Sequence, residues 1–239
     1  MGGIIFHEKK ATFSDGYKAY GNVTLPTNSI MLPSGSPTFV SYAFFGCHGN
    51  NNIGNFDAGI QVSGGAGSAA RYKLFLNGGS VLAASWYETT PAFYASGTQT
   101  LTVELVYLTA TTGKVVISGF GKTLSANFGT GMWQNKFQNG VQFYKELTVA
   151  SSENPFTNLW SSANINKTKT VYMNDMTFGA VSVQRHSGAT TSLDSNCTIT
   201  TGTPKLDPQT SGSVPTWAQM RYGGTPTSGS SNYFSIDCT

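Results

Sequence analysis

The chain of 239 residues has few charged side chains, with 14 Lys and Arg and 11 Asp and Glu. The charged fraction of 10% is well below the ~25% of an ordinary soluble protein. The net charge of +3 is small and the basic residues are scattered, so we expect neither nucleic acid nor an anionic membrane as a partner. Because 39% of the residues are hydrophobic and 13% aromatic, the composition favours a packed core and excludes disorder for most of the chain.

Long hydrophobic runs are also missing. No apolar stretch approaches the roughly 18 residues that a membrane-spanning helix needs, so we expect no membrane span. The first residues, Met1–His7, lack a charged start followed by a long apolar stretch, so we expect no secretory signal peptide in this chain.

Cysteine is scarce and odd in number, with Cys47, Cys197 and Cys238. Three cysteines allow three pairings, and we predict a Cys197–Cys238 disulfide that would fasten the C-terminal residues to the rest of the protein. The sequence leaves the other two pairings open. Three acceptor triplets for N-glycosylation begin at Asn22, Asn166 and Asn196. These triplets and the low charge favour an extracellular (secreted) protein, while the odd cysteine counts against it.

Residue patterns for a metal or a phosphate group are not found either. The three histidines, His7, His48 and His186, are isolated, and nothing resembles a His-Glu-x-x-His or a paired Cys-x-x-Cys motif. Gly121-Lys122-Thr123 resembles the end of a phosphate-binding loop, but the first glycine of that motif would fall at Val116. We therefore expect no metal site and no cofactor.

Alternation of apolar and polar residues is the dominant pattern. In Leu101–Tyr107 the apolar side chains recur at every second position, which is typical of a half-buried strand. Turn residues separate most of the segments, and Asn77-Gly78-Gly79 and Thr112-Gly113 predict hairpins. The predicted strands are Ala19–Leu25, Thr38–Phe45, Ala58–Ser63, Tyr72–Leu76, Ser80–Glu88, Leu101–Tyr107, Gly113–Ser118, Lys122–Phe128, Gln142–Val149, Lys169–Tyr172, Thr177–Gln184 and Tyr233–Cys238.

About a dozen short strands without a convincing helix predict an all-β fold, a two-sheet antiparallel sandwich of the jelly-roll or concanavalin A-like type. We assign residues 1–186 to the β-sandwich domain. Residues 187–239 are rich in Ser, Thr and Gly, and we expect them to complete or wrap the same domain.

Carboxylates are so few that those within strands are informative. A strand places every second residue on the same face, so separate strands can aim polar side chains into one groove. Three segments could do so: Asp57 shares a face with Gln61, Trp86 with Glu88, and Glu146 with Tyr144 and Thr148. A carboxylate, a primary amide and an aromatic wall could thus lie on one sheet surface.

At these residues the chain resembles the glutamic peptidases, the eqolisin family of acid-acting endopeptidases with a concanavalin-like β-sandwich. Ser85-Trp86-Tyr87-Glu88-Thr89-Thr90-Pro91 is similar to the family's Trp-Tyr-Glu-Trp-x-Pro stretch. Gln61, within Ala58–Gly64, and Glu146, within Lys145–Val149, resemble the segments that carry the catalytic glutamine and glutamate. The family's Trp-x-Gly-x-Asp-Gly strand would fall near residues 42–48, where neither Trp nor Asp occurs.

The resemblance implies a polypeptide substrate and a reaction without a cofactor. Ionised Glu146 would take a proton from the attacking water and then pass it to the leaving nitrogen, while the amide nitrogen of Gln61 would donate a hydrogen bond to the oxyanion. A glutamate with a pKa of about 4.3 suits both tasks in mildly acidic medium. The resemblance also implies substrate-binding roles for Asp57, Trp86, Tyr87 and Glu88.

Other interpretations of the same residues stay open. Gln61 could be a polar strand residue facing solvent, Glu146 a surface carboxylate beside Lys145, and Trp86 a core aromatic residue. The alternative functions are non-catalytic and extracellular. One is a carbohydrate-binding module, in which aromatic rings stack on sugars of a glycan. The other is a structural filament or coat subunit that self-associates through its sheet edges.

Overall fold

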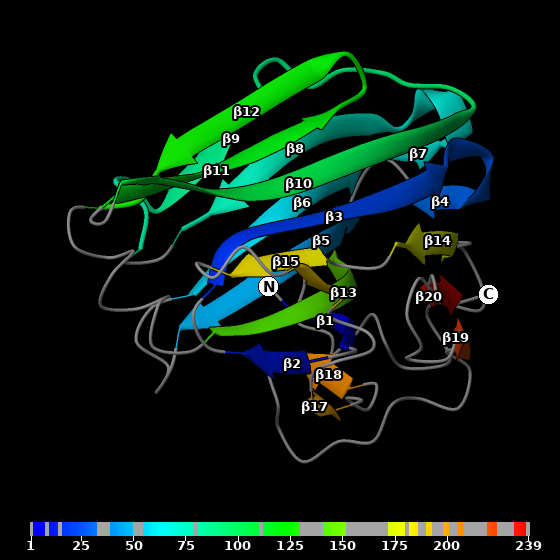
Figure 1. The fold of residues 1–239 in the computed structure, drawn as a ribbon. Coiled ribbons are helices and arrows are strands. Elements are labelled where there is room, and N and C mark those ends of the chain that lie inside the picture. The colour runs from blue at the N-terminus through cyan, green and yellow to red at the C-terminus, as the bar shows by residue number, and fades with distance from the viewer. Residues whose placement is uncertain are drawn as a thin grey trace.

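The computed structural model describes residues 2–7, 10–13, 16–32, 39–49, 55–78, 81–109, 112–129, 141–151, 172–179, 182–185, 190–192, 198–200, 205–207, 219–223 and 232–237. These residues form antiparallel strands and two short 3-10 helices, η1 (Thr27–Ser29) and η3 (Gly67–Ala69). The all-β fold class is confirmed: the strands form two sheets packed as a sandwich (Figure 1). Within the described residues, no helix is long and apolar enough to cross a membrane.

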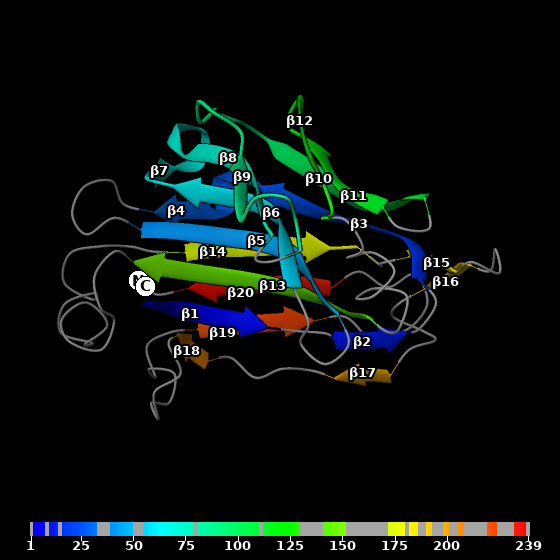
Figure 2. The same ribbon diagram turned by 90° about the vertical axis from the view of Figure 1, so that its left-hand side faces the viewer.

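The first sheet has nine strands, with the order β17-β2-β13-β5-β6-β8-β9 and with β1 and β18 beyond β13. Figure 2 shows β5, β13, β1 and β18 following one another in this sheet. Its strands are β1 (Gly2–His7), β2 (Lys10–Phe13), β5 (Phe39–Gly49), β6 (Asn55–Ser63), β8 (Arg71–Asn77), β9 (Trp86–Glu88), β13 (Val141–Ser151), β17 (Thr198–Thr200) and β18 (Lys205–Asp207).

The second sheet has eleven strands, with the order β12-β11-β10-β3-β14-β20-β19. Four short strands attach to it, β15 and β16 beside β3, and β4 and β7 beside β14. Its strands are β3 (Gly16–Pro26), β4 (Ile30–Leu32), β7 (Gly65–Ala66), β10 (Thr98–Thr109), β11 (Thr112–Gly119), β12 (Lys122–Asn127), β14 (Tyr172–Phe178), β15 (Ser182–Arg185), β16 (Thr190–Ser192), β19 (Gln219–Gly223) and β20 (Asn232–Asp237).

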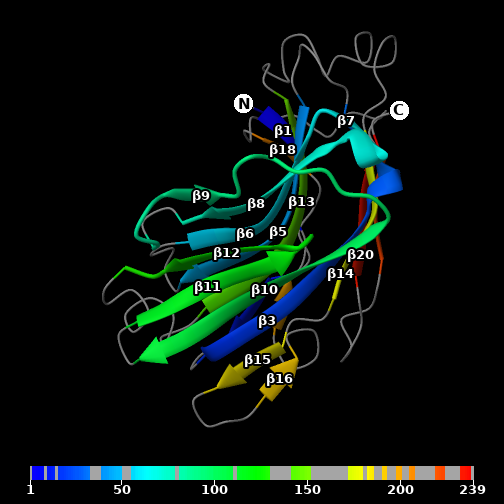
Figure 3. The ribbon, with the colours of Figure 1, turned by 90° about the horizontal axis from the view of Figure 1, so that it is seen from above.

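The core lies between the two sheets. Figure 3 shows β3, β10 and β11 in one layer and β5, β6 and β8 in the other. Leu101, Val103 and Leu105 of β10 are buried, as the alternation predicts. The rings of Phe45 on β5 and Phe178 on β14 meet edge to face across the layers, with centroids 5.4 Å apart. Apolar side chains from both sheets therefore exclude water from the space between them.

Two predicted strands differ in the structure. The strand predicted at Ser80–Glu88 is wrong in its first half, because only Trp86–Glu88 pairs with β8. The backbone N–H groups of Val81 and Leu82 both donate to the carbonyl of Gly78, which makes a turn there, and both side chains are buried. Burial of two successive residues is incompatible with the alternation of a strand, so the predicted β8–β9 hairpin has a longer connection.

The strand predicted at Thr177–Gln184 is divided into β14 and β15. Phe178 lies opposite Val23 of β3, whereas Ser182 lies opposite Tyr20, so the register changes by one residue across the break. The N–H of Gly179 donates to the carbonyl of Asn22, 2.8 Å away.

The C-terminal part of the chain contributes strands to both sheets. β17 pairs with β2 and β18 with β1 in the first sheet, and β20 pairs with β14 in the second. The division at residues 186 and 187 stays a prediction. Cys197, Cys238 and residues 169–171 lie outside the described residues, as do the triplets that begin at Asn166 and Asn196.

Candidate functional site

The candidate site lies on the outer face of the nine-stranded sheet, opposite the face that packs against the second sheet. Residues directly opposite each other on neighbouring strands share a face, so the register defines rows across β13, β5, β6, β8 and β9. The middle row is Glu146, Phe44, Gly59, Phe75 and Glu88. The two flanking rows are Thr148, Tyr42, Gln61 and Lys73, and Tyr144, Gly46, Asp57, Asn77 and Trp86.

This register brings together most of the residues singled out in the sequence. Gln61 on β6 and Glu146 on β13 are placed on the same face, with β5 between their strands and an offset of one row. Asp57, Trp86 and Glu88 belong to the same face.

Tyr87 is the exception among the predicted substrate-binding residues. It lies opposite Leu76 of β8, on the face that turns toward the core, and it packs against the core cluster. Its hydroxyl accepts a hydrogen bond from the backbone N–H of Ala84, 2.9 Å away. Strand alternation explains this result, because Tyr87 must face away from Trp86 and Glu88 on either side of it.

An aromatic cluster forms the floor of the site. Phe75 is only 2% exposed although it lies on the outer face, because the rings of Tyr42, Phe44 and Trp86 surround it. Tyr42 and Phe44 approach it edge to face, with centroids 5.4 and 5.9 Å away. Trp86 stacks on it almost in parallel, with centroids 5.3 Å apart and planes 13° apart, and stays 41% exposed. One face of the indole is therefore supported by Phe75.

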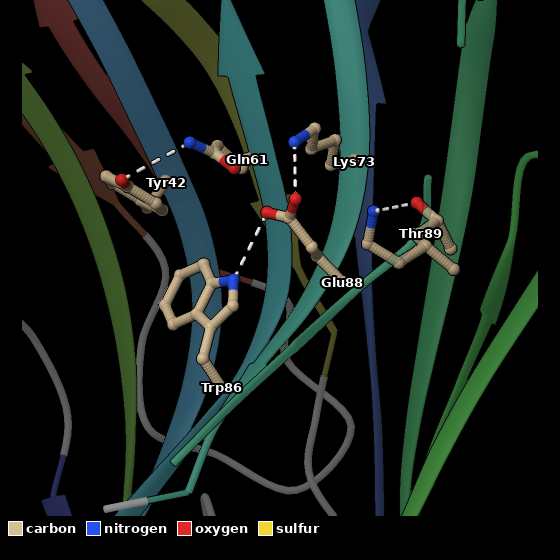
Figure 4. A network of polar contacts seen from close by, with 7 residues as sticks. Tyr42, Gln61, Lys73, Trp86, Glu88 and Thr89 are labelled. Atoms are coloured by element: carbon tan, nitrogen blue, oxygen red, sulfur yellow. Dashed lines mark hydrogen bonds and ion pairs between the residues drawn. The ribbon is translucent and has the colours of Figure 1, made fainter. Parts of the chain in front are cut away.

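Polar contacts hold Trp86 and Glu88 beside this floor (Figure 4). The indole Nε1–H of Trp86 donates to Glu88 Oε2 over 3.1 Å, and Lys73 Nζ forms an ion pair with Glu88 Oε1 at 2.5 Å. The hydrogen bond from Lys73 is the main cause that lowers the pKa of Glu88, so this carboxylate stays ionised in mildly acidic solution. Nearby, Asn77 Nδ2 donates to Asp57 Oδ2 over 3.1 Å.

The amide of Gln61 lies between Tyr42 and the Lys73–Glu88 pair (Figure 4). Its Nε2 donates to the Tyr42 hydroxyl over 3.4 Å. Its Oε1 is buried and, among the residues that the structure describes, has no hydrogen-bond partner. A buried acceptor without a partner is unfavourable by about 1–3 kcal/mol, so the hydrogen-bonding capacity of this amide is not satisfied in the orientation that the structure shows.

We expect Lys73→Met to destabilise the protein by about 0.5–1 kcal/mol near neutral pH, because the partly buried pair with Glu88 is lost. The pKa of Glu88 is lowered in the folded state, so the contribution of the pair is fully present above the unfolded pKa and disappears as the pH falls through the folded pKa. Urea unfolding of both forms should therefore show a smaller difference at about pH 3 than at about pH 7. Lys114→Met, on β11 of the other sheet, is the control. An equal difference for Lys73→Met at both pH values would contradict this assignment.

Tyr42, Phe75 and Lys73 were not identified from the sequence as site residues. Alternation in the predicted strands Thr38–Phe45 and Tyr72–Leu76 could have indicated which face each side chain occupies, since Lys73 and Phe75 alternate with three buried residues of β8. No local signal indicated that β5 and β8 flank the strand of Gln61.

Within the described residues, no group of three or more His, Cys, Asp or Glu could hold a metal ion.

The fold and the outer-face surface define an all-β sandwich with a polar and aromatic sheet face. Two solved peptidase structures share this fold. One is SCP-B, a member of the eqolisin family of peptidases, in a complex with the tripeptide Ala-Ile-His: TM-score 0.50, 13% identity, and coverage of 97% of each chain. The other is scytalido-glutamic peptidase with a transition state analog inhibitor: TM-score 0.50, 13% identity, and coverage of 96% of each chain.

The chain thus has the fold of the glutamic peptidases over nearly its whole length. No protein-family model matches the chain, and no curated protein matches it.

Proposed function

We propose that the protein is an acid-acting glutamic endopeptidase in which Glu146 and Gln61 activate water against a peptide bond. The observation that carries the proposal is the register, which puts positions 146 and 61 on one face with a single strand between them. Strand spacing and rise give a separation of about 12 Å between their Cα atoms. Two extended side chains with a water between them can bridge such a separation.

In the proposed reaction, ionised Glu146 removes a proton from water as the water oxygen attacks the scissile carbonyl carbon. The amide nitrogen of Gln61 donates a hydrogen bond to the oxyanion that forms. Glu146 then transfers the proton to the leaving nitrogen and the C–N bond breaks.

Two observations favour a polypeptide substrate. The indole of Trp86 is stacked on Phe75, and the structural neighbour SCP-B was solved in a complex with a tripeptide. An extended peptide could lie across the rows, with a side chain against the exposed face of Trp86. Asp57 accepts a hydrogen bond from Asn77 and Glu88 accepts one from Trp86. Both carboxylates would lie beside the bound peptide. We also propose an extracellular location, which the low charge of the chain favours.

The test is digestion of an unfolded protein substrate at a pH of about 3–4 by the intact chain and by its Glu146→Ala and Gln61→Ala variants. We expect new peptide termini with the intact chain and almost none with either variant. Unchanged cleavage by both variants would refute the assignment, and so would the absence of cleavage by the intact, folded chain.

Glycan binding without catalysis is a second candidate function, and the geometry of Trp86 favours it. An indole that is 41% exposed and supported from behind by Phe75 can stack on a sugar ring. This function would give saturable binding of a soluble oligosaccharide that Trp86→Ala abolishes, together with no hydrolysis of protein substrates. Hydrolysis that depends on Glu146 would exclude this alternative as the sole function.

A further inference from the structure

The amide of Gln61 has two possible orientations against Tyr42. A tyrosine hydroxyl can accept or donate a hydrogen bond, and a glutamine amide carries a donor nitrogen and an acceptor oxygen. In the structure Nε2 donates to the hydroxyl over 3.4 Å, and the buried Oε1 has no partner within the described residues. If the amide turns by 180°, the hydroxyl donates to Oε1, and Nε2 takes the place of the unpartnered atom.

Only the second orientation, in which the Tyr42 hydroxyl donates to Oε1, suits the proposed reaction. An amide oxygen directed at the developing oxyanion would repel it, whereas the two N–H groups of Nε2 can donate to it. With a substrate carbonyl at Nε2, the second orientation gives each polar atom of the amide a partner. Because this position is buried in the free protein, the substrate must displace neighbouring side chains to reach it. In the first orientation, in which Nε2 donates to Tyr42, the acceptor Oε1 would face the oxyanion, which is also an acceptor.

Tyr42 is well placed to select this orientation. It lies on β5 directly opposite Gln61, and its ring is held edge to face against Phe75 with centroids 5.4 Å apart. Burial is the main cause that raises the pKa of Tyr42, so its hydroxyl keeps the proton in acidic and neutral solution. The hydroxyl therefore keeps a hydrogen that it can donate to the amide.

We propose that Tyr42 is a positioning residue whose hydroxyl donates to Oε1 of Gln61 and thereby directs Nε2 toward the scissile carbonyl. The inference rests on the proposed function for its catalytic consequence, but the hydrogen bond itself can be measured without a substrate. Tyr42 acts through Gln61 and does not take part in the proton transfers of Glu146.

The kinetic test compares Tyr42→Phe with Tyr94→Phe. Phenylalanine at position 42 keeps the ring against Phe75 and removes only the hydroxyl, and Tyr94, 64% exposed, is the matched control. We expect Tyr42→Phe to lower kcat about tenfold or more, because a misdirected donor stabilises the oxyanion poorly. KM and the position of the pH profile should change little, and Tyr94→Phe should match the wild type. An unchanged kcat for Tyr42→Phe would overturn the positioning role.

A second measurement separates this inference from the proposed function. In protein with glutamine labelled with ¹³C and ¹⁵N, the side-chain signals of Gln61 are those missing from Gln61→Leu. We expect Tyr42→Phe to move the Cδ signal of Gln61 more than its Nε2 protons, because the lost bond is to the carbonyl oxygen. Tyr94→Phe should move neither.

These signals decide the orientation even if the wild-type chain cleaves no peptide, an outcome that would refute the proposed function alone. Gln61 signals that do not respond to Tyr42→Phe, or respond mainly at the Nε2 protons, would overturn the inference even in an active enzyme. The remaining signals of the variant show whether it is folded.

Discussion

Glu146→Ala should lower kcat for peptide hydrolysis by about 10²–10⁴-fold, the usual contribution of a positioned general acid–base group. Gln61→Ala should lower it by about 10²–10³-fold, as removal of one oxyanion donor does. KM should change less than kcat in both variants, because these contacts strengthen in the transition state. Initial rates on a chromogenic peptide near pH 3–4 provide the measurement.

Matched substitutions on the other sheet give the control. Glu104→Ala and Gln99→Ala change the same residue types on β10, away from the outer face, and should leave kcat unchanged. The double variant at 61 and 146 should lose less than the product of the two single losses, since both residues act on one step. Losses in the β10 variants as large as those at 61 and 146 would show that the assays report unfolding.

The largest effect on stability is expected for Gly59→Ala. Gly59 lies between Phe44 and Phe75 in the middle row, where the strands approach closely. A Cβ at this position would lie 2.2 Å from the carbonyl oxygen of Ala43 and 2.4 Å from Cβ of Phe44. Because one contact is with backbone, β5 and β6 must move apart, and we expect a loss of about 1–3 kcal/mol in the free energy of unfolding. Urea unfolding monitored by circular dichroism measures this loss.

Ser63→Ala, at the end of the same strand, should change the free energy of unfolding by less than about 0.5 kcal/mol. Movement of Phe75 in Gly59→Ala should also disturb the stacked Trp86 and change its fluorescence. A Gly59→Ala protein as stable as the wild type would mean that β5 and β6 pack less tightly at Gly59 than in the structure.

The resemblance and the residue parity predicted that several of these residues share one face of a sheet. Asp57 with Gln61, and Trp86 with Glu88, share a face because alternation is a property of each strand by itself. The same rule puts Tyr87 on the other face from Trp86 and Glu88, so parity separates it from the residues with which the motif grouped it. Tyr144, Glu146 and Thr148 share their face for the same reason.

Strand pairing was decided by the tertiary structure. The sequence by itself determined that Leu101, Val103 and Leu105 face a core and that the chain forms a sandwich, because such patterns depend on residues two positions apart. Which strands are neighbours depends on contacts between residues far apart in the chain. Only the pairing of β5 with both β6 and β13 brings Tyr42 next to Gln61 and puts positions 61 and 146 on one face. Burial of the inner face and backbone hydrogen bonding select that register jointly, and no short segment contains this information.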